Sequence, residues 1–166
     1  MGCDIHAYIQ YKEKKSASNY WQGFGGEIIL DRSYMMFGVL AGVRDSPKYY
    51  HEPKGLPEHL SWQCEGDLYL QITETGAGDN EITLEGAQNY HRPIIKNDKG
   101  VPYKVQHPDW HSFSWLTTSE LKQAYKWYKK ETGYAPGLQY RVLLKILKEL
   151  ENKDKNEAIL VFWFDN

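Results

Sequence analysis

Two Asp-x-His triplets, at residues 4–6 and 109–111, are the segments of this sequence best suited to chemistry. Apolar and polar residues alternate over residues 3–11, which predicts a β-strand whose alternate side chains leave the same face. Asp4 and His6 can therefore approach one ligand together. A histidine beside a carboxylate suits Zn, Mn or Fe binding, and it also suits general-base catalysis. If the protein is an enzyme, the candidate catalytic residues are His6, His111 and Asp4.

Each triplet also has a purely structural interpretation. Asp4 can pair with an arginine, and His6 can be a half-buried side chain whose hydrogen bonds are satisfied. The second triplet begins at a Pro-Asp step, residues 108–109, which fits a turn in which the aspartate bonds its own backbone. The chemical and the structural interpretations both stay open at this stage.

The two ends of the chain are predicted to meet. Residues 158–164 form a continuous apolar run, typical of a central strand covered on both faces, and Asp165 follows it. If this strand lies antiparallel beside the opening strand, Asp165 comes next to Asp4 and His6. Carboxylates that close repel one another unless a metal or an arginine neutralises them, and Arg44 is the expected cation. The alternative is a divalent metal, with candidate ligands Asp4, His6, Asp109, His111 and Asp165.

The segment 111–114 is expected to contribute to the same pocket as His6. It lies just before a predicted helix start, and the unpaired N–H groups at a helix start attract anions. The long loop 44–63 contains three prolines and several rings, so it is expected to act as a lid or a subunit contact. The predicted ligand-binding residues are Asp4, His6, Arg44, His111, Ser112, Ser114 and Asp165.

These residues are expected to be carried by an α+β fold. A capping box at residues 117–120 predicts a helix over about 117–131, and an apolar stripe predicts a second helix over about 137–152. Both are expected to pack on a mixed or antiparallel sheet in which the N- and C-terminal strands are adjacent. A short helix is predicted over 33–43, and a hairpin is predicted from segments 68–73 and 81–84. No repeat or linker is apparent, so residues 1–166 are interpreted as a single domain.

The composition of the chain limits the partners and ligands that are expected for it. Twenty basic and 22 acidic residues give a net charge of −2, which disfavours nucleic acid and anionic membranes as partners. Aromatic residues make up 14% of the chain, which first indicates a core built from rings and also suits a pocket for a planar ligand such as a nucleobase. Two cysteines are too few for a disulfide framework, and no N-terminal apolar leader is present, so a reducing cytoplasm is expected.

Several motifs resemble those of a family of small phage-encoded proteins, from one end of the chain to the other. They are the opening Met1-Gly2-Cys3-Asp4-Ile5-His6-Ala7-Tyr8, the segments 40–44, 54–57, 111–116 and 120–121, and the closing Phe162-Trp163-Phe164-Asp165-Asn166. The resemblance implies a phage accessory protein in the cytoplasm of a bacterial host. It implies no catalytic role for any residue.

Three functions are compatible with these observations. The first is a counter-defence protein that sequesters a small nucleotide-derived signalling molecule in an aromatic pocket lined by Asp, His and Arg. The second is a metal-dependent phosphodiesterase or nuclease that uses the two triplets to hydrolyse a nucleotide signal or nucleic acid. The third is a protein–protein inhibitor that uses an exposed patch of rings. A homo-oligomer is compatible with all three.

Overall fold

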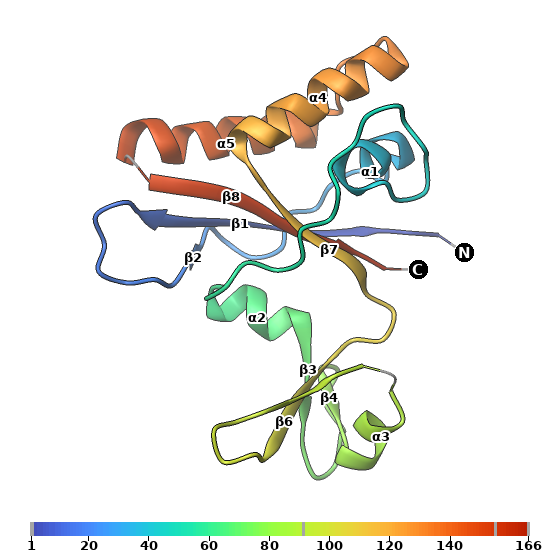
Figure 1. Cartoon of the computed structure of the whole chain (residues 1–166), viewed down its shortest axis with the longest axis vertical. Coiled ribbons are helices and arrows are strands. Elements are labelled where there is room, and N and C mark those ends of the chain that lie inside the picture. The colour runs from blue at the N-terminus through green and yellow to red at the C-terminus, as the bar shows by residue number, and fades with distance from the viewer. Residues whose placement is uncertain (1, 91, 155, 166) are drawn as a thin grey trace. The chain divides into compact units, whose positions relative to one another are not determined.

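The computed structural model describes residues 2–90, 92–154 and 156–165. The chain forms two compact units, Met1–Ser61 with His111–Asn166, and the inserted segment Trp62–Trp110. We call them unit 1 and unit 2, and Figure 1 labels their helices and strands. The predicted α+β class is confirmed. The assignment of one domain stays a prediction, because two compact units can still fold as one cooperative domain.

Unit 1 is built on a four-stranded sheet in the order β2-β1-β8-β7. The opening strand β1 (Ile5–Glu13) and the closing strand β8 (Asn156–Phe164) pair antiparallel over their whole length, from Ile5↔Phe164 to Glu13↔Asn156. Strand β7 (His111–Thr117) lies on the other side of β8, and the short β2 (Gln22–Gly23) lies beside β1. The predicted adjacency of the N- and C-terminal strands is therefore confirmed.

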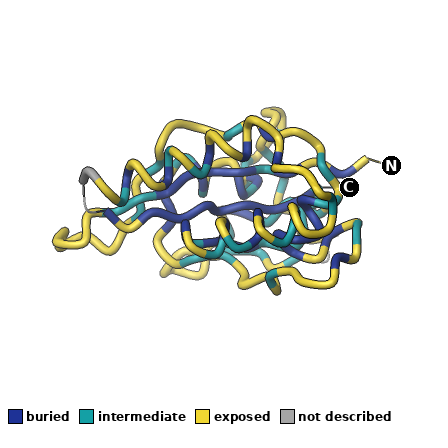
Figure 2. Tube along the Cα trace, turned by 90° about the horizontal axis from the view of Figure 1, so that it is seen from above, coloured by how far each residue is buried: buried dark blue, intermediate teal, exposed yellow. Residues whose placement is uncertain are grey.

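Three helices cover one face of this sheet: α1 (Tyr34–Ala41), α4 (Thr118–Thr132) and α5 (Leu138–Asp154). The two predicted helices over about 117–131 and 137–152 are α4 and α5. The core under them is fully buried, as the dark strands in Figure 2 show. Its strand side chains and helix side chains include Ile5, Ala7, Ile9, Leu160, Phe162, Leu121, Leu143 and Leu147. Among the described residues, no helix has the length and apolarity needed to cross a bilayer.

The ends of the helices in unit 1 follow the sequence signals. Thr117 Oγ1 accepts a hydrogen bond from the Glu120 backbone N–H at 3.2 Å, and the Glu120 carboxylate accepts one from the Thr117 backbone N–H at 2.9 Å. This is the predicted capping box, and it satisfies two donors that the helix leaves unpaired. Gly133 ends α4 with a left-handed φ of 78°. Ser33 caps α1, as predicted.

Unit 2 has its own small sheet, in the order β4-β3-β6-β5. Its elements are α2 (Trp62–Leu68), β3 (Tyr69–Ile72), β4 (Glu81–Ile82), α3 (Leu84–Gln88), β5 (Ile94–Lys96) and β6 (Pro102–Gln106). The hairpin prediction is wrong, because β3 and β4 pair in parallel and the antiparallel partner of β3 is β6. The loop 73–80 folds back on itself: the Glu81 carboxylate accepts hydrogen bonds from Thr73 Oγ1 and the Gly78 N–H, which brings Glu81 beside Gln71.

We expect Thr117→Ala to lower the free energy of unfolding by about 1 kcal/mol, because the first turn of α4 loses its cap. The matched control is Ser119→Ala, which removes an exposed hydroxyl from the same turn and should change stability by less than about 0.5 kcal/mol. Chemical denaturation near neutral pH measures both variants. Equal effects of the two substitutions would show that the capping hydroxyl contributes nothing specific.

The capping box also predicts a pH dependence. Burial raises the pKa of Glu120, but hydrogen bonds from the Thr117 N–H and from Lys54 outweigh it and hold the pKa below the ordinary value of 4.5. A carboxyl whose pKa is lowered on folding stabilises the fold above its unfolded pKa, and this contribution is lost as the pH falls through the folded pKa. We therefore expect Glu120→Gln to destabilise the protein near neutral pH and to matter much less near about pH 3. A penalty that is constant with pH contradicts this assignment.

Candidate functional site

Asp4 is held by Arg32 in a two-pronged ion pair. Arg32 Nε donates to Asp4 Oδ1 at 2.8 Å and Nη2 donates to Oδ2, and these hydrogen bonds hold the pKa of Asp4 below its usual value. A Cβ at Gly2 would lie 2.7 Å from Arg32 Nη1, so a side chain at this position would displace the end of the Arg32 side chain. Arg44 was the expected cation, but its Nη2 donates to the Gly2 carbonyl at 3.3 Å. Arg32 takes the role because it directly precedes the Ser33 cap of α1, beside the start of β1.

His6 lies between two carboxylates. Its Nδ1 is 2.8 Å from Glu27 Oε1 and its Nε2 is 3.2 Å from Asp165 Oδ2, while its ring stacks on Trp163 at 5.7 Å. Asp165 also accepts from the Asp4 backbone N–H at 2.8 Å through Oδ1 and donates its own N–H to the Asp4 carbonyl at 3.2 Å. The structure therefore brings Asp4, His6 and Asp165 together, as the pairing of the two end strands requires. The terminal carboxylate of Asn166 lies outside the described residues.

This cluster of Asp4, His6, Glu27, Arg32 and Asp165, which we call the terminal network, is suited to holding the chain ends together. A histidine that acts as a general base needs one ring nitrogen directed at the substrate, and both nitrogens of His6 are engaged by carboxylates. Within the described ranges, no group of three or more His, Cys, Asp or Glu side chains has the arrangement of a metal site. The network thus matches the structural interpretation of the first triplet.

The second triplet does not join the terminal network. Strand pairing places His111 opposite Phe164, whereas His6 is opposite Trp163, and consecutive residues of β8 face opposite sides of the sheet. The expectation that His111 shares a pocket with His6 is therefore wrong, whereas the ring of Phe113, in the same segment, lies 6.2 Å from Trp163, on which His6 stacks. The cause is a bulge between His111 and Ser114, where Ser112 has a left-handed φ of 53°.

The remaining polar residues of this region have local partners. Ser112 Oγ lies 2.9 Å from His111 Nδ1, and the buried Ser114 Oγ accepts from the Lys54 backbone N–H at 3.1 Å. Asp109, in unit 2, is exposed, and its backbone N–H donates to His107 Nδ1 at 3.3 Å. The segment 107–110 is thus a turn, the structural alternative for this triplet.

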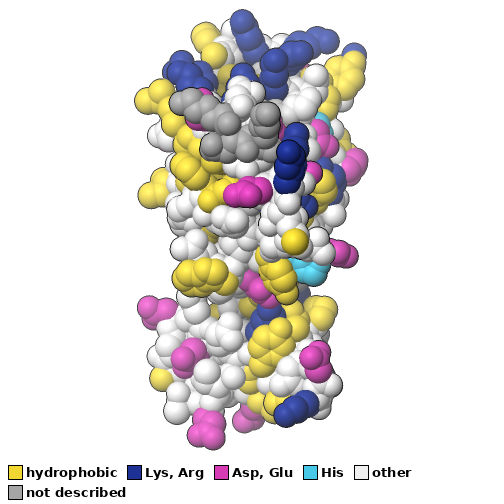
Figure 3. Space-filling model, turned by 90° about the vertical axis from the view of Figure 1, so that its left-hand side faces the viewer, with side chains coloured by type: hydrophobic (Ala, Val, Ile, Leu, Met, Phe, Trp, Pro, Cys, Tyr) yellow, Lys and Arg dark blue, Asp and Glu magenta, His cyan; other side chains and the backbone are white. Residues whose placement is uncertain are grey.

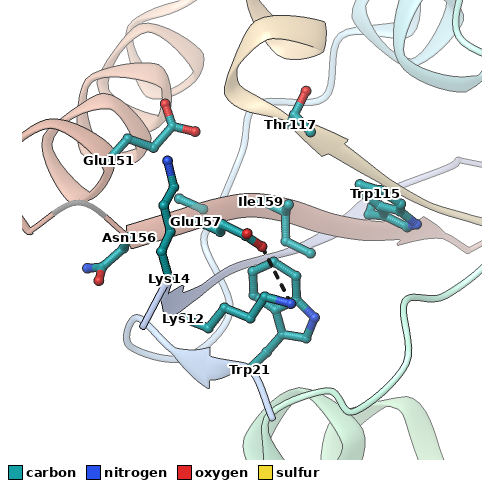
Figure 4. A pocket seen from close by; sticks show the side chains of 10 residues that line it. Lys12, Lys14, Trp21, Trp115, Thr117, Glu151, Asn156, Glu157 and Ile159 are labelled. Atoms are coloured by element: carbon teal, nitrogen blue, oxygen red, sulfur yellow. Dashed lines mark ion pairs between the residues drawn. The ribbon is translucent and has the colours of Figure 1, made fainter. Parts of the chain in front are cut away.

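A groove of about 400 Å³ lies in unit 1 at the other end of β1 and β8. Two indoles border it, Trp21 and Trp115, and Figure 4 shows Lys12 beside Trp21, with Trp115 further along the sheet. A neighbouring hollow of about 370 Å³ shares these three residues. We call the whole surface the indole groove. Its other lining residues are Lys14, Asn19, Pro57, Glu58, His59, Thr117, Glu151, Asn156, Glu157, Ala158 and Ile159.

Strand register explains why these side chains meet. Tyr11 pairs with Gln22, so the preceding Trp21 lies across from Lys12, and Lys12 is itself the cross-strand partner of Glu157. Lys12 Nζ lies 4.5 Å from the centre of the Trp21 ring and 3.4 Å from Glu157 Oε2. Basic side chains gather at the top of this side of unit 1, with hydrophobic ones beside and below them (Figure 3). The Lys12 ammonium thus contacts both the Trp21 ring and the Glu157 carboxylate.

The groove opens because β7 leaves the sheet early. Pairing between β7 and β8 ends at Thr117↔Ile159, where the chain turns into α4, but β8 continues to Asn156. Asn156 is 3% exposed, and its Oδ1 is buried with no hydrogen-bond partner among the residues described. A buried acceptor of this kind is uncommon and favours an additional polar partner in the groove.

The loop 44–61 contributes one wall. The backbone N–H of Trp21 donates to the His59 carbonyl at 2.8 Å, and the His59 ring packs on Tyr20 at 4.9 Å. His59 also lines the groove with Pro57 and Glu58. The loop therefore borders a candidate site, while its predicted movement as a lid stays a prediction.

Sequence reasoning missed the indole groove, although part of its signal was present. The alternation that places Asp4, His6, Tyr8 and Gln10 on one face of β1 reaches Lys12 if the strand is extended by two residues. Comparisons with protein families, with curated proteins and with solved structures found nothing that matches this chain.

We expect the side-chain pKa of Asp4, measured by carboxyl NMR titration, to lie below 3.8 and to rise towards that value in Arg32→Gln. Because folding lowers this pKa, the ion pair stabilises the fold above the unfolded pKa and loses its effect as the pH falls. Arg44→Gln is the matched control and should leave the Asp4 titration nearly unchanged. The reverse pattern, with Arg44 controlling the titration, would restore the sequence-based assignment.

Proposed function

We propose that the protein is a binding protein that sequesters a small nucleotide-derived molecule, with the indole groove as its site. The single observation that carries the proposal is the convergence of Trp21, Trp115 and Lys12 on one groove of about 400 Å³. Pockets of this size hold small organic ligands. Base stacking on aromatic rings contributes about 1–3 kcal/mol per base, and lysines supply charge for phosphate.

The lining of the groove favours retention over conversion. Its polar side chains are lysines, carboxylates, two asparagines, a threonine and one histidine, His59, which can hold a base, a sugar and a phosphate. The histidines of the two triplets, His6 and His111, are not among the residues that line it. The metal-dependent hydrolase required the two triplets to converge, and His111 leaves the sheet on the opposite face from His6. Sequestration is therefore the function that this geometry supports best.

The resemblance to small phage-encoded proteins supplies the biological part of the proposal. In the cytoplasm of a bacterial host, a protein that holds a nucleotide-derived signal would act as a counter-defence factor by lowering the concentration of that signal. Such a role needs a tight site and enough protein to match the signal, and it needs no catalytic residue. We therefore place the ligand-binding site at Trp21, Trp115 and Lys12, instead of at Asp4, His6 and Arg44 as predicted from the sequence.

The test is incubation of the protein with a panel of mononucleotides and cyclic di- and oligonucleotides, followed by heat denaturation and chromatography of the released ligand. We expect at least one nucleotide to be depleted from solution and then recovered intact. Altered ligand on release would indicate an enzyme. A panel from which nothing is depleted would overturn the proposal.

Substitutions then locate the site. For the nucleotide that binds, Trp21→Ala and Trp115→Ala should each weaken binding by about tenfold or more, because each removes a stacking surface. Trp62→Ala is the matched control, since Trp62 is 79% exposed and does not line the indole groove. Isothermal titration calorimetry measures the affinities, and far-UV circular dichroism verifies the fold. Binding that depends on Trp62 but on neither groove indole would place the site elsewhere.

A further inference from the structure

The indole groove presents both donors and acceptors of hydrogen bonds. Glu151 and Glu157 present carboxylates, and the buried Asn156 Oδ1 is an acceptor with no hydrogen-bond partner in the described part of the chain. Lys12 and Lys14 are the ammonium donors. A ligand that complements this surface must therefore bring several N–H donors close together and also present acceptors or negative charge.

Lys12 and Glu157 form the part of this surface that a base would meet first. They are a cross-strand pair beside the Trp21 ring, and Figure 4 shows the ion pair lying over the indole. Their separation of 3.4 Å is longer than the roughly 2.7–2.9 Å of a tight charge-assisted hydrogen bond. Both side chains are partly exposed, at 30% and 50%, so a ligand can enter between them without breaking a buried ion pair.

Among the common bases, guanine is the best match to a lysine next to a carboxylate. Its O6 and N7 accept from lysine, and its N1–H and N2–H2 are adjacent donors that a carboxylate can accept with both oxygens. Adenine and cytosine each offer a single exocyclic amino group next to a ring nitrogen acceptor, which a carboxylate repels. Uracil and thymine offer one N–H between two acceptors. Guanine alone places two neighbouring N–H donors on one edge.

We infer that the indole groove selects guanine nucleotides, an inference that rests on the proposed function and names its ligand class. For the guanine ring to stack on Trp21, the Lys12 ammonium moves from over the indole to the edge of the base, where it meets O6, while Glu157 accepts from N1–H and N2–H2. Lys14 is placed to neutralise the phosphate.

The experiment is calorimetric titration of the full chain with GMP, AMP and CMP. We expect GMP to bind about tenfold or more tightly than AMP or CMP, the difference that one additional hydrogen bond to a charged group provides. Glu157→Gln should reduce the affinity for GMP and leave that for AMP nearly unchanged, because the amide cannot accept with two oxygens. Glu131→Gln, at a carboxyl on α4 that does not line the groove, is the control and should alter neither.

The outcomes separate this inference from the proposed function. Equal affinity for GMP and AMP, with both weakened by Trp21→Ala, overturns guanine selection and leaves nucleotide sequestration standing. Failure of GMP to bind also overturns guanine selection, and sequestration is then decided by the wider nucleotide panel. A GMP preference that survives Glu157→Gln overturns the assignment of Glu157 as the reading residue.

Discussion

The antiparallel pairing of β1 with β8 is the constraint on which the rest of unit 1 depends. It joins the first and last strands of the chain over nine residues each, so folding must close a loop of most of the sequence before this core can form. The pairing fixes which side chains of both strands face the helices. A slip of one residue would turn the whole apolar set of β1 towards the other face, so the register is strongly specified.

The same register positions two polar clusters at opposite ends of one strand pair. The terminal network lies where Ile5 pairs with Phe164, and the indole groove begins where Lys12 pairs with Glu157. Six residues separate His6 from Lys12, which is roughly 20 Å along an extended strand. The two clusters therefore act independently. The terminal network joins the two ends of the chain through hydrogen bonds to Asp165. The Lys12–Glu157 ion pair of the indole groove is longer and partly exposed beside Trp21.

Local signals in the sequence predicted most of unit 1, and long-range geometry limited the prediction of its sites. The capping box at Thr117 and the apolar runs of the end strands are short-range patterns, and they indicated α4, α5 and the β1–β8 contact correctly. Arg32 could not be distinguished from Arg44, because the choice depends on where the chain passes before α1. The bulge at Ser112, which sends His111 to the other face, and the parallel pairing of β3 with β4 leave no periodic signal, since each arises from a loop conformation.

The indole groove combines features that a purely structural surface has little reason to keep together. Asn156 Oδ1 is buried without a partner among the described residues, a state that costs about 1–3 kcal/mol unless a water or ligand donates to it. The early departure of β7 into α4 leaves the β8 edge without a partner on its β7 side from Ala158 to Asn156. Lys12 and Glu157 meanwhile hold opposite charges beside Trp21 at a distance that satisfies neither fully. A ligand with both donors and acceptors on one flat edge can bond to the Lys12 ammonium and the Glu157 carboxylate, which share the face of the sheet opposite Asn156, and this is why a planar, hydrogen-bonding base is a better occupant of this groove than an apolar molecule or a simple anion.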